Sequence, residues 1–407
     1  MHRDILKLNE IAAKPSRMVL GLMSGTSLDG LDIALCEISG HGTQTSCELL
    51  NFLTLEYEQD YRDKVKEVFA KQHASIEHLC LMNAWIARQH AKMVNEALDQ
   101  FTVDRVDVDF IASHGQTIYH SPRVQHGLEE FPNATLQIGD GDHIAHLTGI
   151  ITLSDFRQKH IAAGGQGAPL VMYGDYLLFK SDTENRILLN LGGIANLSLL
   201  PKDSRASILS SDLGPGNTMM DAYVQQYFAP ATFDSDAQIA SKGKVSEPLL
   251  AALLDNVFFN LGMPKTTGPE LFNLQYLDSA ISSAKLQLGN SELTHEDVMA
   301  TLCEFTAVCV ANSICSLAED LRTVSVYSSG GGVHNPLLMQ RIETLVKSGL
   351  PAVKFSSTAD LSVPPDAKEA VLFALLANET ISGEAIDFPA SSTSMPNISM
   401  GKVSFPR

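Results

Sequence analysis

The alternation of apolar and polar positions predicts strands and helices in an order that occurs twice along the chain. Residues 18–38 contain two apolar β-type runs joined by a polar, glycine-bearing turn, which is typical of a β-hairpin. A second hairpin of the same form is predicted over residues 187–200. Because strands and helices follow each hairpin in a similar order, the pattern indicates a duplicated α/β protein.

The remaining periodic segments complete this picture. Further strands are predicted at residues 47–57, 108–112, 135–140, 149–156, 324–329 and 353–357. Helices are predicted at residues 75–101, 217–228, 246–260, 274–286, 295–320, 335–347 and 366–380. We therefore expect an N-terminal lobe over residues 17–185 and a C-terminal lobe over 186–407. The alternative for the last helix is that it packs back on the first lobe.

Composition fits a two-lobed soluble enzyme. The 407 residues are too many for one ordinary core, and 44% hydrophobic with 19% charged residues is a globular mixture. Apolar runs such as Ala370–Ala377 are shorter than the ~20 residues that span a bilayer. The N-terminus lacks the apolar stretch of a signal peptide. The six cysteines form no C-x-x-C pair, so we expect reduced thiols, a cytoplasmic location and no membrane partner.

The charge balance restricts the partners. There are 47 acidic and 29 basic residues, which gives a net charge of −18. A surface this negative repels phosphodiester backbones, so nucleic acid is not expected as a partner. An anionic small ligand would need local donors that outweigh the global field.

The turn of the first hairpin, in GLMSGTSLDGLD (residues 21–32), has the composition of a phosphate site. Gly25 and Gly30 allow a tight turn with exposed backbone N–H groups. Hydroxyl donors and two acids accompany them, and the acids suit a metal-bound water. The alternative is a hairpin that needs only turn residues. The candidate nucleotide-binding residues here are Gly25, Thr26, Ser27, Leu28, Asp29, Gly30, Leu31 and Asp32.

Two further glycine turns extend this nucleotide hypothesis. Gly192 and Gly193 lie in the second hairpin and would give another phosphate-facing turn. Gly330, Gly331 and Gly332 lie between a strand and a helix, where a ribose or flat ring can approach the backbone. No G-x-x-x-x-G-K-[ST] sequence is present, so the protein is not a P-loop enzyme.

Candidate chemistry outside these turns rests on a few charged residues. Asp212 ends a strand before a glycine turn, a favoured position for a base, although an Asp that only caps the turn is the alternative. Asn217, after this turn, can then cap the next helix. Arg157 and Lys159 precede the glycine cluster at 162–170 and are candidate donors for an anionic substrate group, or else belong to an ordinary exposed turn.

His143 and His146 beside Asp142 have a spacing that zinc can use, but no third ligand is evident, which favours packing or surface roles.

Read together, these blocks resemble the anhydro-N-acetylmuramic acid kinase family. The similar stretches include GLMSGTSLDGLD, ASHGQTIYH, SDFR, AAGGQGAPLV, NLGGIANLS, DLGPGN, GGGVHN and PPDAKEA. They occur in order from residue 21 to about residue 376, which covers nearly the whole chain. The resemblance implies an α/β, two-lobed actin/hexokinase-like (ribonuclease H-like) fold with an interlobe cleft.

The resemblance also implies a reaction. ATP, with Mg²⁺ as cofactor, and water would convert 1,6-anhydro-N-acetylmuramic acid into N-acetylmuramic acid 6-phosphate during peptidoglycan recycling. The implied base falls on Asp212, and the implied partners are the anhydro amino sugar, ATP and a second copy of the chain. No protein-derived metal ligand is assigned. The matched blocks suggest substrate contacts at Ser113, His114, Gln116, Arg157, Gln166 and Glu369.

Three departures from the family pattern bear on the substrate. The family usually has Asp at the position of His160, Pro with a nearby His in place of Met172–Asp175, and Arg at the position of Pro269. These changes concern substrate positioning more than kinase chemistry. Two alternatives therefore remain: a related kinase for another amino sugar, and a non-catalytic regulator that binds a nucleotide or sugar.

Overall fold

The computed structural model describes the chain except for residues 1, 26–27, 169, 204–205, 289–292, 319–320, 322, 362 and 385–395. The chain divides into two units, Met1–Phe179 with Ser362–Arg407, and Lys180–Leu361. This division includes the C-terminal helix in the first unit. The sequence-based limits kept residues 186–407 together and gave packing of the last helix on the first lobe as the alternative.

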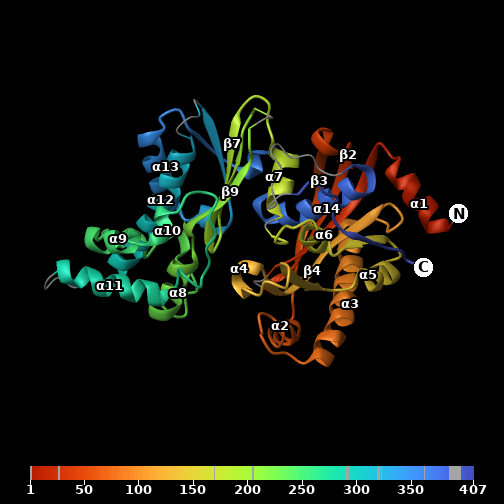
Figure 1. Cartoon of the computed structure of the whole chain (residues 1–407), viewed down its shortest axis with the longest axis horizontal. Helices are drawn as coiled ribbons and strands as arrows, with labels where there is room; N and C mark the ends of the chain where they lie inside the picture. The colour runs from red at the N-terminus through yellow and green to blue at the C-terminus, as the bar shows by residue number, and fades with distance from the viewer. Residues whose placement is uncertain are drawn as a thin grey trace. The chain divides into compact units, whose positions relative to one another are not determined.

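The sheet of the first unit has seven strands, in the order β12-β6-β4-β1-β2-β3, with β5 paired to β4 (Figure 1). Neighbours in β1-β2-β3 are antiparallel, whereas β1, β4 and β6 run parallel. The strands are β1 (Ser16–Ser24), β2 (Gly30–Ser39), β3 (Ser46–Glu56), β4 (Phe110–Ser121), β5 (Ala134–Ile138), β6 (Ile151–Ser154) and β12 (Lys402–Ser404).

The sheet of the second unit repeats this scheme with five strands, in the order β11-β10-β7-β8-β9. An antiparallel β7-β8-β9 meander again continues into parallel strands beside its first member. The strands are β7 (Asn185–Leu191), β8 (Ile194–Leu200), β9 (Leu209–Pro215), β10 (Val324–Ser329) and β11 (Lys354–Ser357). Both predicted hairpins, the duplication and the α/β class are confirmed.

Helices of the first unit cover its sheet in a way that the residue alternation of β1 explains. Leu20 and Leu22 join a buried cluster with residues of α3, whereas Gly21 faces α14. A Cβ at Gly21 would lie 1.9 Å from the carbonyl oxygen of Ala370, so this glycine lets α14 pack directly on the strand. The helices are α1 (Arg3–Ala12), α2 (Gln59–Lys66), α3 (Ile76–Phe101), α4 (Arg123–His126), α5 (Gly141–Thr148), α6 (Phe156–Ala162), α7 (Val171–Phe179) and α14 (Lys368–Ser382).

The second unit is built around the long helix α12. Its helices are α8 (Thr218–Tyr227), α9 (Glu247–Leu254), α10 (Val257–Asn260), α11 (Leu274–Leu288), α12 (His295–Ala318) and α13 (Pro336–Gly349). Among the described residues, α12 alone is long and apolar enough to cross a membrane by length and composition. However, 83% of its most apolar stretch is buried inside the protein. Residues such as Phe305 belong to the core, so the helix reads as a core element.

Three local expectations were wrong. The helix predicted at 246–260 is two helices, because Asn256 is extended and its side chain accepts the N–H of Phe258 to start a new helix. Asp212 lies inside β9, since the strand continues to Pro215. Asn217 does not cap α8 with its side chain, which instead donates to the carbonyl of Leu191 at 3.3 Å.

Candidate active site

The first glycine turn joins β1 to β2 in the first unit. Two of its candidate residues, Thr26 and Ser27, lie outside the described residues. Leu28 is buried and has a left-handed backbone, with φ at 58°. A Cβ at Gly30 would lie 2.5 Å from the carbonyl oxygen of Leu55, so the approach of β3 already requires this glycine. The glycine at position 30 is therefore explained by packing without a ligand.

Acidic side chains gather beside this turn. Asp29 is exposed, and its Oδ1 accepts the N–H of Gly30. Asp32 is half-buried and accepts a hydrogen bond from Thr54 at 2.6 Å. The pKa of Asp32 is raised to about 6, mainly by burial. The charges of Asp29, Glu369 and Asp366 contribute to this rise, whereas the hydrogen bond from Thr54 opposes it. A cation at this cluster would favour the ionised carboxylate.

Arg157, on α6, is held by two acceptors of the same unit. Its Nε donates to Nε2 of His114 at 2.9 Å, and its Nη1 donates to the carbonyl of Gly167 at 2.8 Å. Burial lowers the pKa of Arg157 to about 10, and the charge of Glu369 opposes this shift, so the guanidinium stays charged at neutral pH. Within the described part of the chain, no carboxylate forms an ion pair with it. Asp155 pairs with Lys402 instead.

His114 is the buried partner of this arginine. Burial, with the nearby charge of Arg157, holds the pKa of His114 well below its usual value, so the ring is neutral. Since Nε2 accepts a hydrogen bond from Arg157, the single ring proton is on Nδ1. The ring also packs against Phe373 of α14 at a centroid distance of 4.8 Å. The strand and the helix thus fix the acceptor that orients Arg157.

The glycine cluster before α7 completes this arrangement. The N–H of Gly167 donates to Nδ1 of the buried His160 at 2.8 Å. A Cβ at Gly165 would lie 2.2 Å from the His160 ring, so the ring requires glycine there. His160 is an acceptor for the loop, a role that a carboxylate can also fill. Gln166 is exposed at the tip of the same loop.

The other residues suggested as substrate contacts differ in accessibility. Ser113 and Gln116, on β4, are fully buried, and Gln116 bonds to Ser24 and to the carbonyl of Gly25. Glu369, in the first turn of α14, is exposed. The structure therefore brings Arg157, His114 and the loop of Gln166 together, and it places Gln116 beneath the glycine turn.

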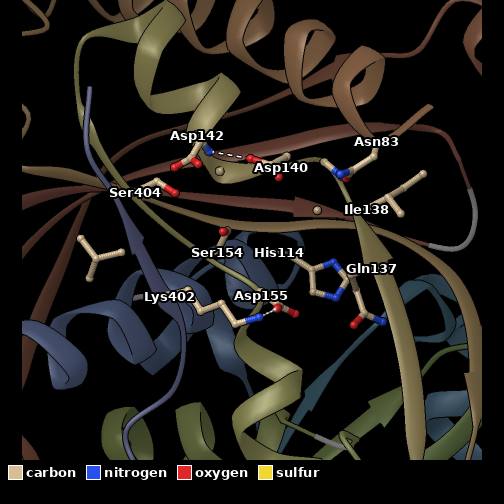
Figure 2. A pocket seen from close by; sticks show the side chains of 14 residues that line it. Asn83, His114, Gln137, Ile138, Asp140, Asp142, Ser154, Asp155, Lys402 and Ser404 are labelled. Carbon is tan, nitrogen blue, oxygen red and sulfur yellow. Dashed lines mark hydrogen bonds and ion pairs between the residues drawn. The ribbon is translucent and has the colours of Figure 1, made fainter. Parts of the chain in front are cut away.

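A polar pocket of about 390 Å³ opens near the end of β6 (Figure 2). Asp140 and Asp155 contribute carboxylates, and Ser154 and Ser404 contribute hydroxyls. These groups suit the hydroxyl-rich surface of a sugar. Sequence reasoning missed Ser404 and Lys402, because the short strand β12 that carries them pairs with β6 from far along the chain.

The suggested zinc pair shows no metal arrangement. His146 contacts the carbonyl oxygen of Pro406 through Nδ1 at 3.2 Å. No group of three or more His, Cys, Asp or Glu side chains is arranged as a metal site in the described part of the chain. Packing therefore accounts for His146 without a metal.

Asp212 is the central acid of the second unit. Its Oδ2 accepts the N–H of Thr267 at 2.9 Å, and its own N–H donates to the carbonyl of Lys265. Burial raises the pKa of Asp212, as does the charge of Glu270, while the Thr267 bond opposes them. Oδ1 has no hydrogen bond to any described residue. The hydrogen bond to Oδ2 therefore orients the carboxylate, and Oδ1 is available to accept a proton.

The two glycine turns of the second unit lie beside each other around Asn217. The N–H of Asn217 donates to the carbonyl of Gly192 at 2.9 Å. A Cβ at Gly332 would lie 3.1 Å from Oδ1 of Asn217, whereas one at Gly331 would meet nothing closer than 3.7 Å. Gly193 and Gly331 are exposed. The backbone at Gly193 and Gly331 is therefore open to solvent.

A short turn separates the third glycine cluster from the helix that follows it, which begins within one residue of the predicted start at 335. A 3-10 turn, Gly331–His334, follows the first glycine, and α13 starts at Pro336. The side chain of Asn335 accepts the N–H of Leu338, so the helix supplies its own N-terminal acceptor. The positive end of α13 therefore does not open directly on the glycines.

Comparison with known proteins identifies relatives over the whole chain. A family model described as anhydro-N-acetylmuramic acid kinase matches residues 17–406. The chain is 54% identical to an anhydro-N-acetylmuramic acid kinase from Pseudoalteromonas atlantica (strain T6c) over 407 residues, which cover all of both chains. It is 39% identical to one from Caldanaerobacter subterraneus subsp. tengcongensis over 401 residues, 98% of this chain and 99% of that one.

One solved structure that aligns with the chain is a ROK family glucokinase from Streptomyces griseus in complex with glucose and AMPPNP. It is 12% identical, with a TM-score of 0.35 over 88% of this chain and 98% of that one. The duplicated strand order defines a two-unit α/β protein. Within that class, the full-length relatives and the family model decide the assignment: the chain belongs to the anhydro-N-acetylmuramic acid kinase family.

Proposed function

We propose that the protein opens 1,6-anhydro-N-acetylmuramic acid with water and phosphorylates its O6 at the expense of ATP, in peptidoglycan recycling. Family membership over residues 17–406 supports the substrate. The observation that carries the chemistry is the carboxylate of Asp212, which one backbone N–H orients and whose second oxygen is unbonded within the described chain. The products are ADP and N-acetylmuramic acid 6-phosphate.

Asp212 is the general base of this proposal. Its Oδ1 takes a proton from the water that attacks C1, and the C1–O6 bond breaks as the new C1–O bond forms. The freed O6 then displaces ADP from the γ-phosphorus. Burial raises the pKa of Asp212, which makes its carboxylate a stronger base.

Arg157 is the proposed donor for the lactyl carboxylate of the substrate. A protein of net charge −18 needs a strong local cation to hold an anion, and a guanidinium can grip a carboxylate with two parallel bonds. The contacts to His114 and Gly167 hold its orientation in advance. The exposed Gln166 and Glu369 are further candidates for polar contacts with the sugar.

The glycine turns are the proposed nucleotide site. The turns at Gly25–Asp32 and Gly192–Gly193 would face phosphates, and Gly330–Gly332 would face the adenosine. Asp29 and Asp32 are the residues that would hold Mg²⁺ through its waters, because their mutual repulsion favours a cation there. Mg²⁺ supplied with the nucleotide neutralises charge on the phosphates.

Isotope labelling tests this function. The protein is incubated with ATP, Mg²⁺ and 1,6-anhydro-N-acetylmuramic acid in ¹⁸O water, and a sample of unlabelled product in the same water measures spontaneous exchange. We expect ¹⁸O at C1 of the 6-phosphate above that background. Phosphorylation of only a different amino sugar would support the related-kinase alternative. Ligand binding without ADP formation would support a non-catalytic regulator.

We also propose that the protein is a cytoplasmic homodimer. Its six cysteines are free, which agrees with a reducing compartment. The dimer rests on the family resemblance alone. Light scattering during gel filtration should give twice the chain mass of 44.1 kDa, and a single chain mass at micromolar concentration would contradict it.

A further inference from the structure

A buried polar network lies beneath the first glycine turn. Nε2 of Gln116 donates to the carbonyls of Gly25 at 3.2 Å and Thr117 at 3.4 Å. Since both partners are acceptors, the amide of Gln116 has one orientation, and its Oε1 faces Ser24. The hydroxyl of Ser24 donates to this Oε1 at 2.6 Å. The end of β1 is thereby bonded to β4.

The directions of the bonds that link His90 to Gln116 through Tyr57 and Ser24 follow from that orientation. Tyr61 also contacts His90 and Gln116. Ser24 has one hydroxyl proton and gives it to Gln116, so Tyr57 donates to Ser24, at 2.7 Å. The proton of Tyr57 is thus used, and Nε2 of His90 donates to Tyr57 at 3.0 Å. His90 is fully buried, and burial lowers its pKa to about 4, so the ring is neutral. The network runs one way, from α3 to Gly25.

The end of the first glycine turn that leads into β2 is also held by hydrogen bonds. Nε of Arg62 donates to the carbonyl of Leu28 at 2.9 Å, and its Nη2 donates to the carbonyl of Asp29 at 3.3 Å. The backbone N–H of Tyr57 also donates to the carbonyl of Asp29 at 3.0 Å. Leu28 has a left-handed backbone, which an ordinary side chain adopts only when its surroundings hold it there. Arg62 supplies such a hold.

We propose that Tyr57 and Arg62 are positioning residues that set the first glycine turn for nucleotide phosphates. Arg62 donates to the carbonyls of Leu28 and Asp29. Tyr57 acts through Ser24, which orients Gln116 as the donor to the carbonyl of Gly25. Carbonyl oxygens carry partial negative charge, so engaging them in hydrogen bonds lowers their repulsion of a phosphate. This inference rests on the nucleotide role of the turn proposed above.

Substitutions on α2 test the proposal. Arg62→Met removes both donors, and the Kd for ATP with Mg²⁺ should rise about 5- to 10-fold, the size of one ordinary hydrogen bond, because Arg62 acts on the turn and not on the nucleotide itself. The Kd for 1,6-anhydro-N-acetylmuramic acid should stay unchanged. Arg62→Lys should restore part of the ATP affinity, because an ammonium can donate to one carbonyl. The matched control is Lys64→Met on the same helix, where Lys64 pairs with Asp60.

Tyr57→Phe tests the Gly25 end of the turn, because it removes only the hydroxyl that bonds Ser24. It should also weaken ATP more than sugar binding, with a readout by calorimetry and a melting curve. Unchanged ATP affinity in both variants, or equal losses for ATP and sugar, would overturn the proposal. If Gly25→Val leaves ATP affinity unchanged, the nucleotide role of the turn fails. If Gly25→Val weakens ATP and Arg62→Met does not, only the positioning role fails.

Discussion

Arg157 donates a hydrogen bond from Nε to Nε2 of His114, although 43 positions separate the two residues in the chain. The contact sets the tautomer of His114, and with the bond from Arg157 to Gly167 it fixes the plane of the guanidinium. A fixed, charged guanidinium without a carboxylate partner among the described residues is prepared for an anionic ligand. The carboxylate role of Arg157 can therefore be separated from a purely structural one.

Arg157→Lys should raise KM for 1,6-anhydro-N-acetylmuramic acid at least several-fold and leave KM for ATP nearly unchanged. A lysine keeps the charge but loses the paired donors that match a carboxylate. Lys14→Met, which breaks the ion pair with Asp109 in the same unit but outside the polar pocket, is the control for the loss of an ion pair. Steady-state kinetics and a melting curve distinguish a carboxylate-binding role from a structural one. A lower Tm with both KM values unaltered would show that Arg157 is a structural residue only.

His114→Phe keeps the ring that packs on Phe373 and removes the acceptor for Arg157. It should raise KM for the carboxylate-bearing substrate several-fold. Turnover of 1,6-anhydro-N-acetylglucosamine, which lacks the lactyl carboxylate, should not change in this variant. His114→Gln should recover part of the loss, because its Oε1 can accept from Arg157. Equal effects on both sugars would show that His114 does not act through the arginine.

Features that depend on neighbouring residues in the chain were predictable from the sequence, whereas contacts between distant segments were not. The two hairpins and the helix at 75–101 were correct because their signal is local periodicity within one element. The pairing of Arg157 with His114 and the bonds of Arg62 to the first turn depend on how separate elements pack, which no local pattern encodes. The strand β12 was missed because three residues carry too little periodicity.

Asp32→Asn should stabilise the protein at neutral pH. The pKa of Asp32 is about 6 in the folded state against an ordinary value of 3.8, so the folded state binds this proton more tightly. Stability from this group is therefore lost as the pH rises from about 4 to 6. The Tm gain of Asp32→Asn should be present at pH 7.5 and absent at pH 4. Asp60→Asn, at an exposed acid, is the control, and a pH-independent difference would contradict this account.

Gly25→Val should weaken ATP binding while the fold stays intact. A branched side chain would occupy the space where the backbone of the turn is proposed to approach phosphate. Gly262→Ala is the matched control, since its Cβ would meet nothing within 4 Å. Calorimetry with Mg²⁺ present measures the affinity, and circular dichroism monitors the fold. An unchanged ATP affinity would mean that the turn is only a hairpin.

The most direct test of the proposed chemistry is the turnover number of Asp212→Asn. Asparagine keeps the shape of the side chain and an acceptor for the N–H of Thr267, but it cannot take the proton of the attacking water. Turnover of 1,6-anhydro-N-acetylmuramic acid should fall by at least ~10²-fold, with the Kd for ATP retained. Near-normal turnover in this variant would contradict the assignment of Asp212 as the base.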